Sequence, residues 1–540
     1  MTMRRAPLLA ALVLAACGGT DNTHYVVVSV DWPAAVHDAT SLTITLGNAG
    51  TSRTDTLSVA GKTPPVEFSV SAPGRTGDLT IAVDASTASG TVGRGTASAK
   101  LSDARARVTL DATDFVVNTD FAGDQQPDDN IDDGGLQLAA RDDQWTVAFR
   151  SCPTASDSCD MFGRTFDAAG KPVQTEAAAG TNEYPISTMP SSKQSNPVIA
   201  AGPASTLVVW DYASPEDLKT LGIACRSFDA KGRPGDTQTT TTISAEPTIT
   251  AAVAPLATGN FLATWTVYSN DPANPTHQQI HGSIIKPDCT PLLVPATPFT
   301  IAAPVGVDGD RSVVAVNGDA VLYAWLEGTL MINAFLPPAD LHVRVGSTTA
   351  APAGADVTLL RKTATEGVSY ARLAPAPGGG FTLAVRWSNL TTATAPGRIE
   401  LYQLSAAGAI TSGPLVITDK TTSDLNTDAE AIAVTTRMAD GVTLVAWHAC
   451  GDNGDGNECG VFGQFVTGGA LVGDRFTIPT TTTGDQTLPS VGALADAFVA
   501  VWSDKSAAAP DIAGSAVRAR ILYPPGADRP ATAWLGDMTF

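Results

Sequence analysis

A short apolar segment that ends in an aromatic residue recurs seven times along this 540-residue chain. Successive closing aromatics are 61, 55, 60, 62, 60 and 55 residues apart, so the repeated unit is about 59 residues long. Six of the nine tryptophans occupy this one position. The seven aromatics are Phe149, Trp210, Trp265, Trp325, Trp387, Trp447 and Trp502. A repeat of this kind buries its apolar faces only by stacking on copies of itself.

Each copy carries the pattern of four antiparallel strands. An apolar strand such as 197–201 precedes the aromatic strand, and a polar loop follows it. A third strand then runs into an Asp-x-x-Gly-x-Pro turn, as at 167–172 and 229–234, and a fourth strand such as 474–478 ends the unit. Four strands repeated seven times predict a seven-bladed β-propeller over residues 135–540, because adjacent blades cover each other's faces and a closed ring has no long open edge.

The predicted propeller leaves three points open. The repeated aromatics are expected to pack between blades, and a ring of aromatic ligand platforms is the alternative. An open β-solenoid is the rival architecture, although its coils are normally shorter than this repeat. Residues 533–535 are a candidate for the last outer strand, but the sequence does not say which end of the chain closes the ring.

Residues 24–114 predict a separate strand-rich domain. Apolar residues alternate with polar ones, as in Leu42, Ile44 and Leu46, and Gly or Pro breaks separate about seven short runs. This pattern is typical of an Ig-like or fibronectin-like β-sandwich. Glycine and proline together make up 49 + 36 = 85 residues, which also favours short strands joined by turns. The fold class is therefore all-β, with the N-terminal β-sandwich followed by the propeller.

The segment between the two predicted domains, residues 115–134, is rich in aspartate and is interpreted as an acidic linker. The whole chain carries a formal net charge of −21. A molecule this acidic is repelled by the phosphate backbone, so nucleic acid is excluded as a partner.

The first 17 residues have the features of a bacterial export signal. Two arginines, Arg4 and Arg5, precede a short apolar run that ends in Leu14-Ala15-Ala16-Cys17. These last four residues resemble the bacterial lipobox, which implies that Cys17 is lipidated and that residues 18–23 form a short tether. An ordinary cleaved signal with an incidental cysteine is the alternative. The expected location is the cell envelope, lipid-anchored to the outer membrane of a Gram-negative bacterium.

Cysteine usage agrees with an exported protein. Without Cys17 six cysteines remain, an even number that suits an oxidising compartment. Two pairs are close in sequence and follow the aromatic strand of their repeat. The predicted local disulfides join Cys152 to Cys159 and Cys450 to Cys459, while the pairing of Cys225 with Cys289 is left open. A metal site is the alternative for the local pairs, but no matching histidine lies beside them.

Residues that signal chemistry are few. No nucleophile elbow, zinc-binding helix motif or phosphate loop is present, and His342 and His448 each stand alone in the sequence. Paired carboxylates on a propeller axis would come from different blades, so their spacing is not readable here. The best metal candidate is a Gly-rich turn whose oxygen atoms suit Ca²⁺, formed by Asp452, Asn453, Asp455 and Asn457. Its spacing matches no EF-hand loop, and an ordinary hairpin tip is the favoured interpretation. No other cofactor is expected.

The repeat as a whole, with its Pro-x-Val-Ala, Val-Val-Trp and Phe-Asp-x-x-Gly-x-Pro elements, resembles repeats of large bacterial secreted and surface proteins. Together with the lipobox and the N-terminal domain it resembles surface lipoproteins of myxobacteria over residues 134–525. The resemblance implies a location and a shape, and no activity. We therefore expect a lipid-anchored, non-enzymatic binding or scaffold protein with a protein or carbohydrate ligand. The alternative is a secreted polysaccharide hydrolase or lyase with its active site in the propeller funnel.

Overall fold

The computed structural model describes residues 23–119, 136–151, 160–173, 183–187, 193–213, 221–229, 232–241, 248–267, 278–292, 298–304, 307–328, 339–348, 352, 354–389, 397–419, 432–451, 454–456, 458–509, 511, 514–526 and 531–540. Over these ranges the fold is all-β: nine sheets and a single 3₁₀ turn, η1 (Pro377–Gly379). No helix in this part of the chain has the length and apolar character needed to span a bilayer.

The chain divides into two compact units. The first comprises residues 1–111 and 528–540, and the second comprises residues 112–527. The first unit contains a sheet in the order β37 (Ala533–Thr539), β4 (Val66–Pro73), β1 (Thr23–Asp31), β7 (Arg105–Thr109). A second sheet has the order β3 (Thr51–Ser58), β2 (Ser41–Asn48), β5 (Asp78–Thr87), β6 (Gly90–Lys100), β8 (Asp111–Ala112).

The two-residue periodicity read from the sequence is visible as burial in the first unit. Along β2 and β5 buried positions alternate with more exposed ones, and Leu42, Ile44 and Leu46 are fully buried. Successive side chains of a strand point to opposite faces, so this alternation places one face of the sheet in a core and leaves the other more exposed.

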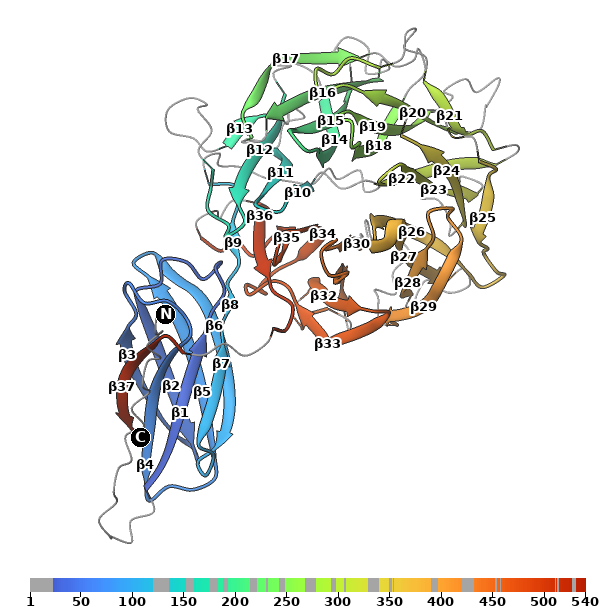
Figure 1. The fold of residues 1–540 in the computed structure, drawn as a ribbon. Helices are drawn as coiled ribbons and strands as arrows, with labels where there is room; N and C mark the ends of the chain where they lie inside the picture. Colours follow the sequence, from blue (N-terminus) through green and yellow to red (C-terminus); the bar gives the residue numbers. More distant parts are fainter. Residues whose placement is uncertain are drawn as a thin grey trace, which may run out of the picture. The chain divides into compact units, whose positions relative to one another are not determined.

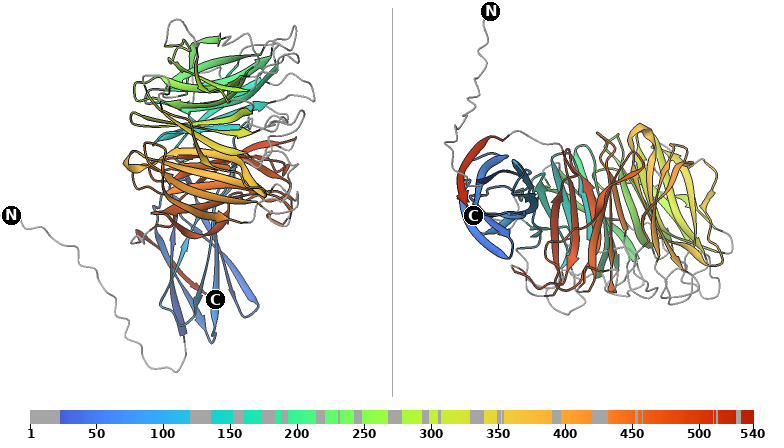
Figure 2. Two further views of the ribbon diagram at one scale, coloured as in Figure 1. Left: turned by 90° about the vertical axis from the view of Figure 1, so that its right-hand side faces the viewer. Right: turned by 90° about the horizontal axis from the view of Figure 1, so that it is seen from below.

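The end of the chain belongs to the first unit, which corrects the predicted propeller range of 135–540. Strand β37 runs parallel to β4 and covers its open edge, as Figure 2 shows for the red C-terminal strand on the blue sheets. Met538 is buried there, and the Ser69 hydroxyl donates to Asp537 Oδ1 over 2.6 Å. Residues 533–535 therefore supply no strand to the repeats, because an unpaired edge in the first unit takes them instead.

The second unit consists of seven consecutive four-stranded sheets, which we number 1 to 7 in chain order. Sheets 1 to 3 are β10 (Leu136–Ala140), β11 (Gln144–Ser151), β12 (Asp160–Asp167), β13 (Glu183–Pro185); β14 (Lys193–Ala201), β15 (Ser205–Ala213), β16 (Leu221–Asp229), β17 (Pro234–Thr241); and β18 (Thr248–Pro255), β19 (Phe261–Val267), β20 (Gln279–Ile285), β21 (Phe299–Ala302).

Sheets 4 to 7 continue the same order. They are β22 (Asp308–Asn317), β23 (Ala320–Gly328), β24 (Asp340–Ser347), β25 (Val357–Leu360); β26 (Glu366–Pro375), β27 (Phe381–Asn389), β28 (Arg398–Leu404), β29 (Ile410–Thr418); β30 (Ile432–Thr436), β31 (Thr443–Ala449), β32 (Gly460–Thr467), β33 (Ala470–Thr477); and β34 (Gln486–Ala493), β35 (Phe498–Asp504), β36 (Ala516–Leu522), β9 (Phe115–Val116). The first strands contact one another in chain order and that of sheet 7 contacts that of sheet 1, which gives the ring in Figure 1.

The strand that completes sheet 7 comes from the other end of the repeats. Strand β9 pairs antiparallel with β36, although Phe115 and Val116 fall inside the range interpreted from sequence as the acidic linker 115–134. Just before β9, the buried Asp114 carboxylate accepts from Arg518 over 2.7 Å and from the backbone N–H groups of Thr480 and Thr481. That start of the linker is thus a fixed structural strand.

The side chain of Phe115, in sheet 7, contacts sheet 1 at the point where the ring closes. Its ring lies 6.3 Å from Trp145 and 5.7 Å from Phe166, and those two rings stack on each other at 4.2 Å. Trp145 and Phe166 are fully buried in sheet 1. The aromatic contact therefore joins the first and last sheets of the repeat.

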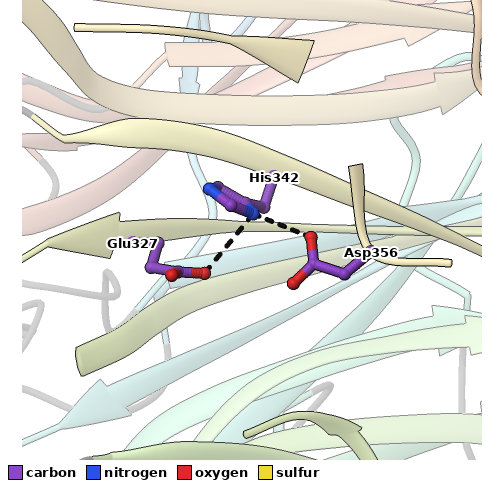
Figure 3. Close-up of side chains that lie close together, drawn as sticks. All are labelled: Glu327, His342 and Asp356. Carbon is purple, nitrogen blue, oxygen red and sulfur yellow. Dashed lines mark hydrogen bonds and ion pairs between the residues drawn. The ribbon is translucent and has the colours of Figure 1, made fainter. Parts of the chain in front are cut away.

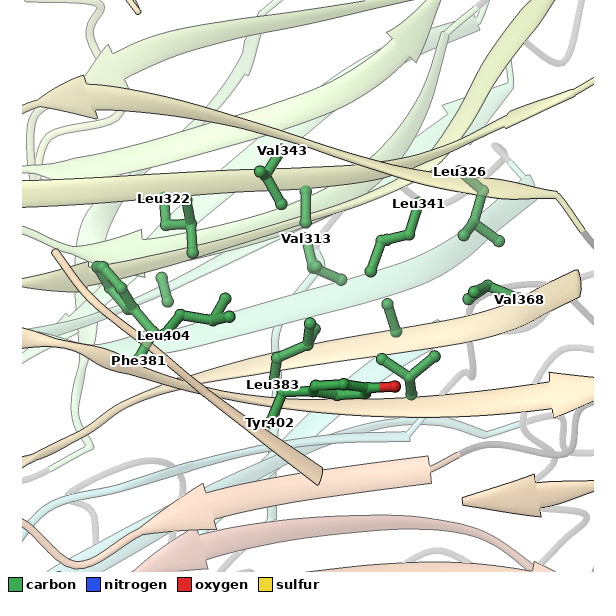
Figure 4. Close-up of a cluster of buried hydrophobic side chains, with 14 of the residues drawn as sticks. Val313, Leu322, Leu326, Leu341, Val343, Val368, Phe381, Leu383, Tyr402 and Leu404 are labelled. Carbon is green, nitrogen blue, oxygen red and sulfur yellow. The ribbon is translucent and has the colours of Figure 1, made fainter. Parts of the chain in front are cut away.

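The repeated aromatics lie in the interfaces between sheets. All seven are buried, with Trp387 the most exposed at 7%. The six tryptophans each belong to an apolar cluster that is shared with the preceding sheet. Figure 4 shows one such cluster, in which Leu322 and Val343 of sheet 4 face Phe381 and Leu383 of sheet 5. Burial of a large apolar side chain stabilises the folded state by about 1.5–3 kcal/mol. Packing between sheets therefore explains why an aromatic residue recurs at this position of each repeat.

The Asp-x-x-Gly-x-Pro turn also serves an interface. Asp167 Oδ1 accepts from the N–H groups of Ala169 and Lys171, and Gly170 takes a φ of 86° that L-residues rarely adopt. A Cβ at Gly170 would lie 3.1 Å from the ring of Phe115 in sheet 7. The turn of sheet 1 thus packs closely on its neighbour.

The structure contains two disulfides among the described cysteines. One joins Cys450 to Cys459, and the other joins Cys225 of sheet 2 to Cys289 of sheet 3, the pairing that the sequence left open. Cys289 takes the positive-φ place in its turn that Gly170 takes in sheet 1. In the chain-entropy model a crosslink across 64 residues contributes about 4 kcal/mol.

We predict that Phe115→Ala lowers the stability of the second unit by about 2 kcal/mol, because it removes the partly buried aromatic contact that closes the ring. The urea midpoint of tryptophan fluorescence measures the effect, since Trp145 lies at this interface. Leu471→Ala is the control, because Leu471 is 44% exposed on β33. Equal midpoints for the two variants would contradict the prediction.

Candidate functional site

A pocket of about 410 Å³ lies where the first strands of all seven sheets meet. Its walls come from the last residues of these strands, among them Ile199, Ala254, Ala315 and Leu373. The side chains are mostly small and apolar because each first strand packs against two neighbouring first strands. None of the described lining residues is aromatic.

Charged groups are present only where the first strands turn back. Arg141, Asp142 and Arg437 line the pocket there. Arg141 donates to Gly202 O and Thr206 Oγ1 of sheet 2, and its pKa is lowered chiefly by burial. Arg437 forms two hydrogen bonds with Asp440, of 3.0 and 2.6 Å. Both arginines are therefore engaged in holding the turns.

Among the described residues that line the pocket, Asp142 is the one carboxylate. Glycosidases use two carboxyl groups, about 5 Å apart in retaining enzymes and about 6.5–9.5 Å apart in inverting ones. The described part of the lining therefore lacks the carboxylate pair that most glycoside hydrolases use.

A second polar group is buried at the beginning of the first strands of sheets 4 and 5. Arg311 of β22 donates to Ser369 O over 2.9 Å, and its guanidinium lies 4.7 Å from the centre of the Tyr370 ring. Arg386 of β27 donates to Ser369 Oγ over 3.2 Å, and the Ser388 hydroxyl also donates to that oxygen, over 2.8 Å. The group joins the faces of two adjacent sheets by hydrogen bonds.

Burial changes the protonation of this region. Desolvation lowers the pKa of Arg386 to about 9, and the nearby Arg311 adds to the effect. His448 of β31 is 4% exposed, and its pKa is lowered to about 3 by desolvation and by the positive charge of Arg386. His448, which stands alone in the sequence, is thus a neutral, buried imidazole in the fold.

Several residues singled out in the sequence fall outside the described part of the chain. These are Cys17, Cys152, Cys159, Asp452, Asn453 and Asn457. Asp455 is described and partly buried, so one of the four suggested calcium ligands is placed. Lipidation, the first local disulfide and the calcium turn therefore stay predictions.

The pocket and the Arg386 group were not found by sequence reasoning. Pocket residues such as Ala254 and Ala315 look like ordinary strand residues, and only ring closure brings them together. Arg386 did carry a signal: the residue before the repeated aromatic is Ala, Val or Thr in the other six copies, and here it is arginine.

No protein-family model and no curated protein matches this chain. Solved structures do match it at low identity. A protein of unknown function from Dyadobacter fermentans is 9% identical with a TM-score of 0.41, covering 76% of this chain and 99% of that chain. The α-L-arabinanase of Penicillium chrysogenum, solved with arabinobiose, is 14% identical with a TM-score of 0.38, covering 65% of this chain and 97% of its own.

The acylaminoacyl peptidase of Pyrococcus horikoshii is 11% identical with a TM-score of 0.38, covering 68% of this chain. This chain spans about half of that enzyme, 49% of its length. With TM-scores below 0.5, these likenesses carry no conclusion about activity, substrate or partner.

We predict that acid destabilises the second unit through His448. The pKa of this imidazole is about 3 in the fold and about 6.5 in an unfolded chain, so between these values the unfolded state binds one more proton. Stability should therefore fall by about 1.4 kcal/mol for each pH unit below about 6.5. Urea midpoints from pH 7 to pH 4 measure this slope for the protein and for His448→Gln. An equally steep slope in His448→Gln would contradict the assignment.

Proposed function

We propose that this chain consists of an Ig-like β-sandwich domain and a seven-bladed β-propeller domain. We also propose that a lipid on Cys17 anchors it to the cell envelope. Seven consecutive four-stranded sheets with contacting first strands support the propeller, and the two sheets of the first unit support the sandwich. The lipobox resemblance at residues 14–17 supports the anchor.

We further propose that the propeller binds a ligand without transforming it. The observation that carries this proposal is the lining of the central pocket, whose described side chains are mostly small and apolar, with Arg141, Asp142 and Arg437 where the first strands turn back. Small-molecule and peptide pockets are predominantly apolar and measure about 300–1,000 Å³. The absence of aromatics from the lining favours an apolar segment of a partner protein over a sugar, which commonly stacks on aromatic rings.

The alternative from the sequence, a polysaccharide hydrolase or lyase, requires catalytic groups at the funnel. The lining of this pocket does not provide a carboxylate pair. The alternative is tested directly by incubating the protein with polysaccharides and arabinobiose and measuring new reducing or unsaturated ends. Turnover by the unmodified protein that Ala439→Trp abolishes would favour this alternative.

We predict that Ala439→Trp blocks ligand capture without unfolding the ring. Ala439 is exposed and lines the pocket, so an indole there fills the opening. Cys17→Ala protein serves as bait for an envelope extract, alongside a glycan array, with Ala439→Trp and Ala407→Trp compared quantitatively. Ala407 is equally an exposed turn residue but does not line the pocket, so its variant is the control. Equal capture by both variants would overturn the pocket as the binding site.

We predict that Cys17→Ala releases the protein from the membrane fraction. Several acyl chains on one residue anchor a protein stably, and each buried CH₂ contributes about 0.8 kcal/mol. Fractionation and metabolic labelling with a radioactive fatty acid measure the anchor. Label that persists in Cys17→Ala, or wild-type protein found in the soluble fraction, would contradict lipid attachment at this residue.

A further inference from the structure

Three side chains of sheet 4 form a compact group of nitrogen and oxygen ligands. Figure 3 shows Glu327, His342 and Asp356 converging, and one potential ligand atom of each lies within 4.8 Å of the others. His342 Nδ1 is 2.7 Å from Asp356 Oδ1 and 3.4 Å from Glu327 Oε2. We call these residues the sheet 4 triad, and we propose that it binds a divalent transition metal ion of the Zn²⁺ class.

Sheet 7 has the same types of residue at the positions that match the sheet 4 triad. Glu327 lies two residues after Trp325, as Asp504 lies two residues after Trp502. His342 pairs with Trp325 across the sheet, as Arg518 pairs with Trp502.

The third position repeats as well. Asp356 stands two residues before Thr358, the partner of His342 on β25. Asp114 stands two residues before Val116, the partner of Arg518 on β9. The two sheets therefore place one basic residue and two carboxylates at matching points.

In sheet 7 these positions make a closed ion-pair network. Arg518 lies 2.9 Å from Asp504 and 2.7 Å from Asp114, and all three side chains are at most 5% exposed. A guanidinium is always charged in proteins and is not a metal ligand. The repeat thus sets a permanent cation between two carboxylates at this point.

Sheet 4 keeps both carboxylates and replaces the guanidinium by an imidazole. Neutral imidazole nitrogen and carboxylate oxygen are standard Zn²⁺ ligands, with bonds of about 2.0–2.2 Å. Adjacent ligands at a tetrahedral ion are then about 3.3 Å apart, close to the 3.4 Å between His342 Nδ1 and Glu327 Oε2. Asp356 Oδ1, now 2.7 Å from Nδ1, would move outward by about 0.6 Å on metal binding, which its exposed position allows. A divalent ion would balance the charges of the two carboxylates, Glu327 and Asp356.

Neighbouring groups orient the ligand atoms. Thr358 Oγ1 is 3.3 Å from His342 Nε2 and can accept a hydrogen bond from the Nε2–H group, which leaves the Nδ1 lone pair directed at the carboxylates. The Trp325 indole N–H donates to Glu327 Oε2 over 3.4 Å. Asp356 is 46% exposed, so solvent can reach the site and take a fourth coordination position.

The test uses untagged, chelator-treated protein in two measurements: titration with Zn²⁺ by calorimetry, and titration with Co²⁺ by visible absorption. We expect one equivalent of each ion to bind, and a raised melting temperature with Zn²⁺. Loss of an outer partner alone lowers metal affinity 10–100-fold, so Asp356→Asn should weaken binding by about a hundredfold or more.

His342→Arg is the decisive variant, because it recreates the sheet 7 network. We expect it to fold and melt without dependence on metal, and to give no Co²⁺ absorption. His281→Arg is the matched control, since His281 pairs with Trp265 at the same point of sheet 3. Metal binding that is absent from the wild type, or that persists in His342→Arg, would overturn the proposal and leave His342 as an ion-pair partner. Ca²⁺ binding with no Co²⁺ or Zn²⁺ response would also overturn it.

Discussion

The second unit depends on closing a ring of sheets whose faces are covered only by one another. Each four-stranded sheet has two apolar faces. One face is buried against the preceding sheet of the ring and the other against the following sheet. Sheet 7 has three strands of its own, so its outer edge and the interface with sheet 1 both depend on β9. The buried Arg518–Asp114 pair therefore holds together segments that are 404 residues apart. The Phe115 aromatic contact packs the same segment against sheet 1.

The ring also shows how one scaffold accommodates different chemistry. Apolar positions between sheets repeat with little change, because the interfaces are closely packed and tolerate only small changes in side-chain volume. Polar positions at the same register differ: an arginine opposite the tryptophan in sheet 7, a histidine in sheet 4. In sheet 5 the residue opposite Trp387 is Arg398, which pairs with Glu366 and Glu400. In all three sheets two carboxylates lie beside this basic residue, from other strand positions in sheet 5, and of the three basic residues only the imidazole can coordinate a metal.

Part of this arrangement was predictable from the sequence and part was not. The spacing of Trp210, Trp265 and the other aromatics predicted the repeated sheets, since apolar periodicity reports burial directly. The roles of Phe115 and of residues 533–539 were missed. Both are short strands next to polar segments, and a strand's partner is decided by which sheet edge is open, a property of the folded molecule.

The sequence by itself determined the all-β class, the period of the repeat and the residues that fill its interfaces, because these follow from local alternation and from aromatic spacing. The tertiary structure alone decided which ends complete which sheets, which small residues surround the central pocket, and that Glu327, His342 and Asp356 meet. The physical reason is that strand register and ring closure join residues that are far apart in sequence. A sequence pattern shows local periodicity but does not show which distant residues meet.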